Sequence, residues 1–233
     1  MSSNTERGYG ARIGNAEKLV RALESFNNYQ TTKPELSIPG MNEQIALIKN
    51  LNTQVASTKQ VYSLAVENRL QILEKNPDSI KKMLSPINAS VKAFFGKEAK
   101  QSLDVASIIK KMRGKNIVKS INSEENTISQ SYQSYHSKTQ FFADLIVNVS
   151  AFDNDYNPIN PKLSVTSLKA LYDNAVSANK YVVYCHTQFV LTNEKRIKAY
   201  ELLSLNAIRA KESVKAQYGT QSVEYRLVKS LCI

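Results

Sequence analysis

The stretch MNEQIALIKNLNTQVASTKQVYSLAVENRLQIL, residues 41–73, decides the fold. Steps of four and three residues from Met41 to Leu73 follow one side of an α-helix, and most positions on this seam are apolar. A second stretch, LKALYDNAVSANKYVVYCHTQFVLTNEKRIKAY at residues 168–200, carries an equivalent seam 127 positions later. Two long amphipathic helices can bury their apolar sides only against other helices, so the seams predict an all-α fold.

The same offset of 127 holds outside the two helices. KPELS at residues 33–37 matches NPKLS at residues 160–164, which indicates a tandem duplication. We therefore expect two helical repeats, residues 1–116 and 117–233, related by an approximate twofold axis and packed together as one antiparallel helical bundle. Each repeat is expected to hold a first helix, a proline-bearing link, a long helix and a broken third helix.

Prolines and glycines place the expected helix ends. Gly40 or Asn42 is expected to cap the first long helix, and Asn76 with Pro77 to stop or kink it. Pro86 is expected to end a short helical piece that begins at Asp78. Residues 101–112 form another predicted helix, and its expected buried side is Leu103, Val105, Ile108 and Ile109.

The composition is that of an ordered, basic protein. The 233 residues are 42% hydrophobic and carry a formal charge of +11, which favours anionic partners but also serves solubility. The longest apolar run, residues 141–147, is far shorter than the roughly 20 residues that cross a bilayer, so no membrane association is expected. Two cysteines and a polar amino terminus without a signal-peptide pattern favour a cytoplasmic location.

The second half contains NPKL at residues 160–163 and VKAQYG at residues 214–219, followed by Ser222 and Tyr225. These segments resemble the N-P-x-L segment and the V-K and G-x-x-S-x-x-Y ending of a group of uncharacterised all-helical proteins from Bacteroidota. The chain departs from the group where Arg196 is followed by Ile197 in place of Asn. The resemblance covers the last third well and implies an all-helical fold in a bacterial cytoplasm, without an activity.

Residues that could carry chemistry are sparse in the sequence. Cys185 and His186 are adjacent, so they point about 100° apart on a helix and cannot share a metal or act together as nucleophile and base. His136 is the only other histidine, and no phosphate-binding loop or hydrolase motif occurs. We expect no metal, no cofactor and no catalytic residue.

Four polar residues lie on the apolar seams. Asn52 and Asn179 occupy equivalent positions, and we interpret them as buried polar residues that fix helix register, with ligand binding as the alternative. Arg69 and Arg196 also lie on the seams, and their expected partners are carboxylates of another helix or half. A buried polar enzyme site at this arginine layer remains a further alternative.

The densest positive charge lies between residues 81 and 119. This segment contains ten basic residues and only two acidic ones, which predicts either a solvated face or a phosphate-binding surface. The residues expected to bind nucleic acid are Lys110, Lys111, Arg113, Lys115 and Lys119. Phe94 and Phe95 are expected in the core, and not as platforms for base stacking.

These observations lead to two functional hypotheses. The first is a non-catalytic helical-bundle scaffold or interaction protein, whose partners are other proteins or further copies of this chain. The second is a protein that associates with nucleic acid through charge and without sequence preference.

Overall fold

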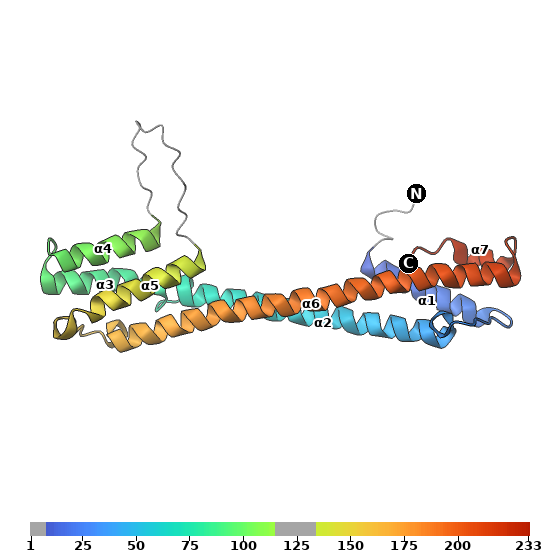
Figure 1. Ribbon diagram of the computed structural model, residues 1–233, viewed down its shortest axis with the longest axis horizontal. Coiled ribbons are helices and arrows are strands. Elements are labelled where there is room, and N and C mark those ends of the chain that lie inside the picture. Colours follow the sequence, from blue (N-terminus) through green and yellow to red (C-terminus); the bar gives the residue numbers. More distant parts are fainter. Residues whose placement is uncertain (1–7, 115–133) are drawn as a thin grey trace, which may run out of the picture. The chain divides into compact units, whose positions relative to one another are not determined.

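The computed structural model describes residues 8–114 and 134–233, which form helices packed against each other, with no strand in either range (Figure 1). The predicted all-α class is therefore confirmed. The α-helices are α1 (Tyr9–Ser25), α2 (Ile38–Leu70), α3 (Ile80–Phe95), α4 (Lys100–Arg113), α5 (Tyr135–Ser150), α6 (Val165–Tyr218) and α7 (Val223–Lys229). The short turns are η2 (Pro34–Leu36), the π-helical η3 (Gln71–Lys75), η4 (Asp153–Asp155) and η5 (Pro161–Leu163).

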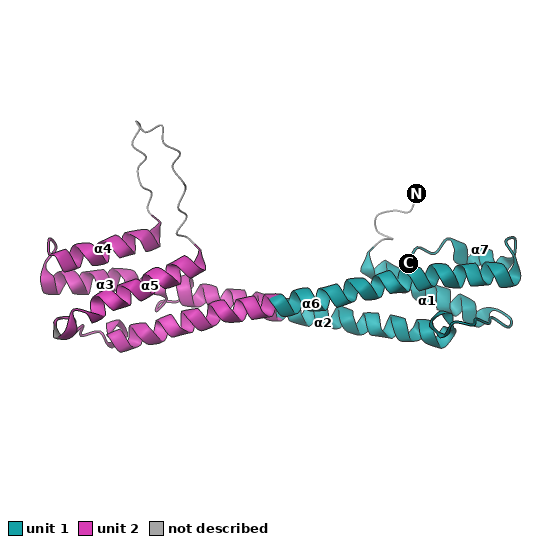
Figure 2. Ribbon diagram, viewed as in Figure 1, with its two compact units in different colours: residues 1–60, 187–233 teal, residues 61–186 magenta. Residues whose placement is uncertain are grey.

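The chain divides into two compact units (Figure 2). Unit 1 consists of Met1–Gln60 and Thr187–Ile233, and unit 2 of Val61–His186. Both long helices contribute to both units, so each unit combines segments from the two predicted repeats. The predicted boundary between residues 116 and 117 lies outside the described residues.

The core of unit 1 joins α1, the first part of α2, the last part of α6, and α7. Along α6 the buried side chains recur every three or four residues, as the seam requires. They are Tyr200, Leu203, Ala207, Ala210 and Val214. A fully buried leucine side chain such as Leu203 contributes roughly 1.5–3 kcal/mol to folding.

The long helices run in opposite directions within unit 1. The Nδ2 atom of Asn206 on α6 donates to Gln44 on α2 at 3.0 Å, and Asn52 on α2 donates to Tyr200 on α6 at 2.9 Å. Residue numbers therefore rise along one segment while they fall along the other. This pairing brings the asparagine of the first seam against the end of the second.

The core of unit 2 is built mainly by α3, α4 and α5, with the start of α6 and the π-helical η3. On α4 the buried side chains are Val105, Ile109 and Met112, whereas Leu103 is 54% exposed. The expectation that Leu103 is buried was wrong because it lies two positions before Val105, on nearly the opposite side of the helix. Ile108 is partly buried against the same core.

Three expectations about helix ends are corrected or refined. Pro86 lies inside α3 and does not end it, because Leu84, Ile87 and Val91 bury the same side before and after the proline. The helix α2 ends at Leu70 and continues through the π-helical η3 to Lys75, just before Asn76 and Pro77.

Gly40 has a different role from the expected cap. The hydroxyl of Ser37 accepts from the Gly40 amide at 3.2 Å and so caps the start of α2. A Cβ atom on Gly40 would lie 2.1 Å from the Pro34 carbonyl oxygen. A glycine is therefore required where the first turn of α2 crosses the η2 turn.

Candidate functional site

Cys185 and His186 are both held in structural contacts in unit 2. The side chain of Cys185 is buried against Ala65 and Val182. The ring of His186 lies 5.2 Å from the ring of Tyr62, and His136 is exposed on α5. Among the described residues, no three His, Cys, Asp or Glu side chains gather as a metal site would require.

A polar cluster in unit 1 joins Tyr9, Arg12, Asn52, Arg196 and Tyr200, and we call it the Tyr200 cluster. Asn52 Nδ2 donates to Tyr200 Oη at 2.9 Å, and Tyr200 Oη donates to the Tyr9 carbonyl at 3.1 Å. The Tyr9 and Tyr200 rings lie 4.6 Å apart between centroids. Tyr200 is only 1% exposed and Tyr9 is 39% exposed, so the cluster reaches from the core to the surface.

Two guanidinium groups cover the aromatic pair of the Tyr200 cluster. The Cζ atom of Arg196 lies 4.3 Å from the Tyr9 ring centroid, and that of Arg12 lies 4.8 Å from the Tyr200 ring centroid. Arg12 also donates to the Tyr200 carbonyl at 2.9 Å and to the Ser204 hydroxyl at 2.6 Å. The cluster thus ties the start of α1 to α2 and α6.

A second cluster in unit 2 joins Arg69, Tyr135, Lys138, Thr139 and Asn179, and we call it the Tyr135 cluster. Asn179 Nδ2 donates to Thr139 Oγ1 at 3.0 Å, and Thr139 donates to the Tyr135 carbonyl at 2.8 Å. The Cζ atom of Arg69 lies 4.0 Å from the Tyr135 ring centroid. The cluster ties the start of α5 to α2 and α6.

Neither seam arginine meets its expected carboxylate partner among the described residues, and both guanidinium groups stack on tyrosine rings instead. A guanidinium is planar and weakly hydrated, so an aromatic face can replace a carboxylate where burial would desolvate the ion pair. Glu67 instead pairs with Lys75 at 3.0 Å. Arg196 also donates to Asn193 on its own helix.

Each cluster leaves polar atoms buried. Asn52 Oδ1, Asn179 Oδ1, Arg69 Nε and Arg196 Nε have no hydrogen-bond partner among the described residues. A buried polar group without a partner costs about 1–3 kcal/mol. These four unpaired atoms therefore lower stability, while the paired atoms of the clusters join specific helices.

The sequence pattern alone missed five members of these clusters: Tyr9, Arg12, Tyr135, Lys138 and Thr139. Tyr9 and Tyr135 stand 126 positions apart, the same spacing that separates Phe26 from Phe152. That repeated spacing is a signal that could have paired the two tyrosines. It would not have indicated which arginine stacks on each tyrosine ring.

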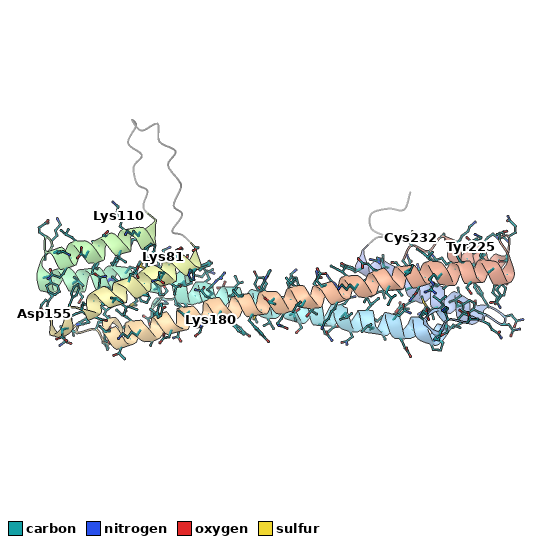
Figure 3. All side chains as sticks on the ribbon, viewed as in Figure 1. Lys81, Lys110, Asp155, Lys180, Tyr225 and Cys232 are labelled. Carbon is teal, nitrogen blue, oxygen red and sulfur yellow. The ribbon has the colours of Figure 1, made fainter. Side chains whose placement is uncertain are left out.

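Three of the five predicted nucleic-acid-binding residues lie in the last part of α4. Lys110, Lys111 and Arg113 are exposed in or next to the last turn, whereas Lys115 and Lys119 lie outside the described residues. Arg113 donates to the Ser85 hydroxyl on α3 at 2.6 Å. Lys81 on α3 is also exposed, and both it and Lys110 are labelled in Figure 3.

A small pocket in unit 2 brings basic residues of three helices together. Its volume is about 110 Å³, and Lys81, Arg113 and Lys138 line it with a single acid, Glu74. Lys138 Nζ donates to Glu74 at 2.8 Å, and this hydrogen bond holds the pKa of the Glu74 carboxyl below its usual range. The other lining residues are Leu73, Ile80, Leu84 and Met112.

The aromatic pair next to the basic residues divides between core and surface. Phe95 is partly buried, and its ring lies 5.0 Å from that of Phe152. Phe94 is 57% exposed, so the expectation that it belongs to the core was wrong. The core of α3 is formed by Ile80, Met83, Leu84, Ile87 and Val91, whereas Phe94 lies in the last turn, where the helix ends at Phe95.

Unit 1 also carries an apolar patch on the outer side of α6. Leu202, Leu205 and Ile208 are 51%, 53% and 59% exposed. We call these three side chains the α6 patch. No helix among residues 8–114 and 134–233 combines the length and apolarity that a membrane crossing requires.

Comparison with known proteins gives no family model, no curated protein and no solved structure that matches this chain.

Proposed function

We propose that this protein is a non-catalytic helical scaffold that acts by binding other chains. The observation that carries the proposal is the α6 patch, where Leu202, Leu205 and Ile208 stay exposed on one helix. Adjacent exposed leucines and isoleucines are typical of protein interaction surfaces. The two free thiols, Cys185 and Cys232, accord with a cytoplasmic setting.

The polar groups of the seams support a structural role within this proposal. Each of the four seam residues contacts a side chain of another helix; they are Asn52, Asn179, Arg69 and Arg196. Arg196 also contacts Asn193 on its own helix. A polar residue in an apolar seam favours one helix arrangement over others, although it lowers stability. These contacts fit a role in helix register.

The proposal includes a tandem duplication that forms an antiparallel bundle with approximate twofold symmetry. Equivalent contacts in the two repeats support it. Tyr29 Oη donates to the Leu36 carbonyl at 3.2 Å, and Tyr156 Oη donates to the Leu163 carbonyl at 2.9 Å. Burial raises the pKa of Tyr29, and it raises the pKa of Tyr156 to about 12.

A screen for turnover tests the non-catalytic part of the proposal. The pure protein would be incubated with a broad panel of metabolites and hydrolase substrates, beside Arg69→Ala and Arg196→Ala variants. We expect no turnover with any of the three proteins. A robust activity that one substitution abolishes, while circular dichroism shows a retained fold, would overturn the proposal and favour an enzyme site at the arginine layer.

A second candidate function is association with nucleic acid without sequence preference. The observation that favours it is the basic pocket, where Lys81, Arg113 and Lys138 come from three helices. Exposed Lys110 and Lys111 extend the positive charge along α4. Such a surface recognises phosphate charge and does not read bases.

Salt dependence tests the second candidate. With about four to six phosphate contacts and a log–log slope near −0.9 per contact, affinity for duplex DNA should fall about a hundredfold or more between roughly 50 and 200 mM salt. Reversing the charge of Lys110, Lys111, Arg113 and Lys115 together should abolish binding. The same change at Lys162, Lys169 and Lys180 is the matched control. Equal losses in both variants would indicate diffuse attraction, and no binding at low salt would eliminate this candidate.

A further inference from the structure

The α6 patch lies at the centre of a longer exposed face in unit 1. An α-helix turns about 100° per residue, so Leu202 and Ile208 lie about 60° to either side of Leu205. Two positive and two negative residues flank the three apolar side chains, and all four lie within about 40° of Leu205 around the helix axis. They are Lys198, Glu201, Arg209 and Glu212.

The order of residues along this face is complementary to its own reverse. Lys198 and Glu212 stand seven positions to either side of Leu205, and Glu201 and Arg209 stand four positions to either side. Leu202 and Ile208 stand three positions to either side. An identical helix laid antiparallel across Leu205 would therefore bring each of these charges next to an opposite one.

The charged residues of this face have only weak contacts within the chain. Lys198, Glu201 and Glu212 are exposed. The Arg209 guanidinium lies 3.4 Å from a Glu35 carboxylate oxygen, and Glu212 lies 3.3 Å from Lys215. Ion pairs this exposed contribute little to stability, so the charges are available for new partners.

We propose that a second copy of this chain binds the outer face of α6, with the two helices antiparallel and a twofold axis passing at Leu205. A self-complementary patch is what a twofold dimer requires, because each residue then meets its mirror-position partner twice. A parallel arrangement would instead place Lys198 on Lys198 and Glu201 on Glu201. This inference rests on the proposed scaffold function and names its partner.

Disulfide trapping tests the position of the axis. In a Cys232→Ser background, Leu205→Cys should form an intermolecular disulfide with its own copy under mild oxidation. Leu202→Cys should cross-link slowly with itself, since its two copies lie three residues to either side of the axis. Leu103→Cys on α4 is the matched collision control, because Leu103 and Leu205 are 54% and 53% exposed.

The expected rate difference is large. Pairing within a complex raises the effective thiol concentration from micromolar toward millimolar, so Leu205→Cys should cross-link roughly tenfold or more faster than Leu103→Cys. Equal rates for the two variants would overturn the proposed axis. Fast cross-linking of Leu202→Cys with itself would indicate a parallel contact and would equally overturn it.

Charge exchange tests the pairing independently. Glu201→Arg and Arg209→Glu should each shift the monomer–dimer equilibrium toward monomer by about tenfold or more in sedimentation velocity, because each creates two like-charge contacts per dimer. The double variant should restore dimerisation. Failure of the double variant to recover, with circular dichroism unchanged, would contradict the pairing. A wild-type protein that stays monomeric would overturn this interface, whereas the turnover screen would still decide the scaffold function.

Discussion

The Tyr200 cluster of unit 1 and the Tyr135 cluster of unit 2 use different hydroxyls for the same hydrogen bond. In unit 1 the asparagine donates to Tyr200 on α6, whereas in unit 2 it donates to Thr139 on α5. The residue 127 positions before Tyr200 is Leu73, and the residue 126 positions before Thr139 is Ile13. Unit 1 therefore has a hydroxyl at Tyr200 and an aliphatic side chain at Ile13. Unit 2 has the reverse, with the hydroxyl at Thr139 and an aliphatic side chain at Leu73.

The comparison shows that a buried amide constrains its surroundings less strictly than an apolar side chain does. What it requires is one acceptor within reach, and that acceptor can come from either neighbouring helix. In both units the hydroxyl also donates to the carbonyl of a tyrosine at the start of a helix. In both units two successive hydrogen bonds therefore link an asparagine amide, a hydroxyl and a tyrosine carbonyl. Only the residue that supplies the hydroxyl differs.

The largest expected effect comes from removing the whole Tyr200 side chain of unit 1. Tyr200→Ala should lower the free energy of unfolding by about 3–5 kcal/mol, because it opens a cavity at a fully buried ring. Thr139→Ala in unit 2 removes a much smaller group and should cost about 1–2 kcal/mol. Urea denaturation of both variants measures the difference. Similar losses would show that the Tyr200 ring is not the main apolar contact of its cluster.

Exchanging the two hydroxyl positions should sharpen the comparison. Tyr200→Leu alone should cost about 1–3 kcal/mol, because the Asn52 amide loses its acceptor. Adding Ile13→Thr gives unit 1 the arrangement of unit 2, and we expect it to recover about 1 kcal/mol. Ile13→Thr in the wild-type background is the control and should destabilise. Additive losses in the double variant would mean that the two clusters are not interchangeable.

The arginine stacks should respond alike in the two units. Arg69→Lys and Arg196→Lys keep the charge but lose the planar contact with the tyrosine ring, so each should cost about 0.5–1.5 kcal/mol. Thermal unfolding followed by circular dichroism can compare them with Arg226→Lys on α7, a control in a helix that holds neither stack. An unchanged midpoint for both variants would argue that the rings contribute packing alone.

The smallest expected effect is a gain. Asn52→Leu and Asn179→Leu should each raise the free energy of unfolding, by about 1 kcal/mol or less, while loosening the unique helix arrangement. Neither change leaves an orphaned donor, since Tyr200 still donates to Tyr9 and Thr139 to Tyr135. Denaturation and amide exchange would be measured together. Destabilisation by several kcal/mol in both variants would refute the register interpretation.

Helical periodicity was enough to predict the all-α class and which sides of the helices carry the buried residues. Along α6 it placed Leu168, Ala175, Val182 and Tyr200 in the interior, as the structure does. It also placed Asn52 and Asn179 among apolar neighbours. These features depend on spacing along one helix, which a sequence displays directly.

Contacts between distant segments could not be read in the same way. Periodicity gives the side of a helix on which Arg196 lies, but the tyrosine it meets is 187 positions earlier in the chain. The continuity of α3 through Pro86 was missed for a related reason. Packing of Leu84, Ile87 and Val91 against other helices outweighs a local preference, and no local pattern reports that packing.

Unit 1 is formed by two segments that are far apart in the sequence, and this affects how it folds during synthesis. Its two parts are separated by the 126 residues of unit 2, which a ribosome adds in about 6–25 s at roughly 5–20 residues per second. Throughout that time Leu19, Leu23 and Met41 lack the α6 and α7 side chains that cover them in the finished protein. Unit 2 can assemble as soon as its own residues have emerged. The nascent chain therefore exposes the apolar sides of α1 and the first part of α2 to chaperones until its last helices leave the ribosome.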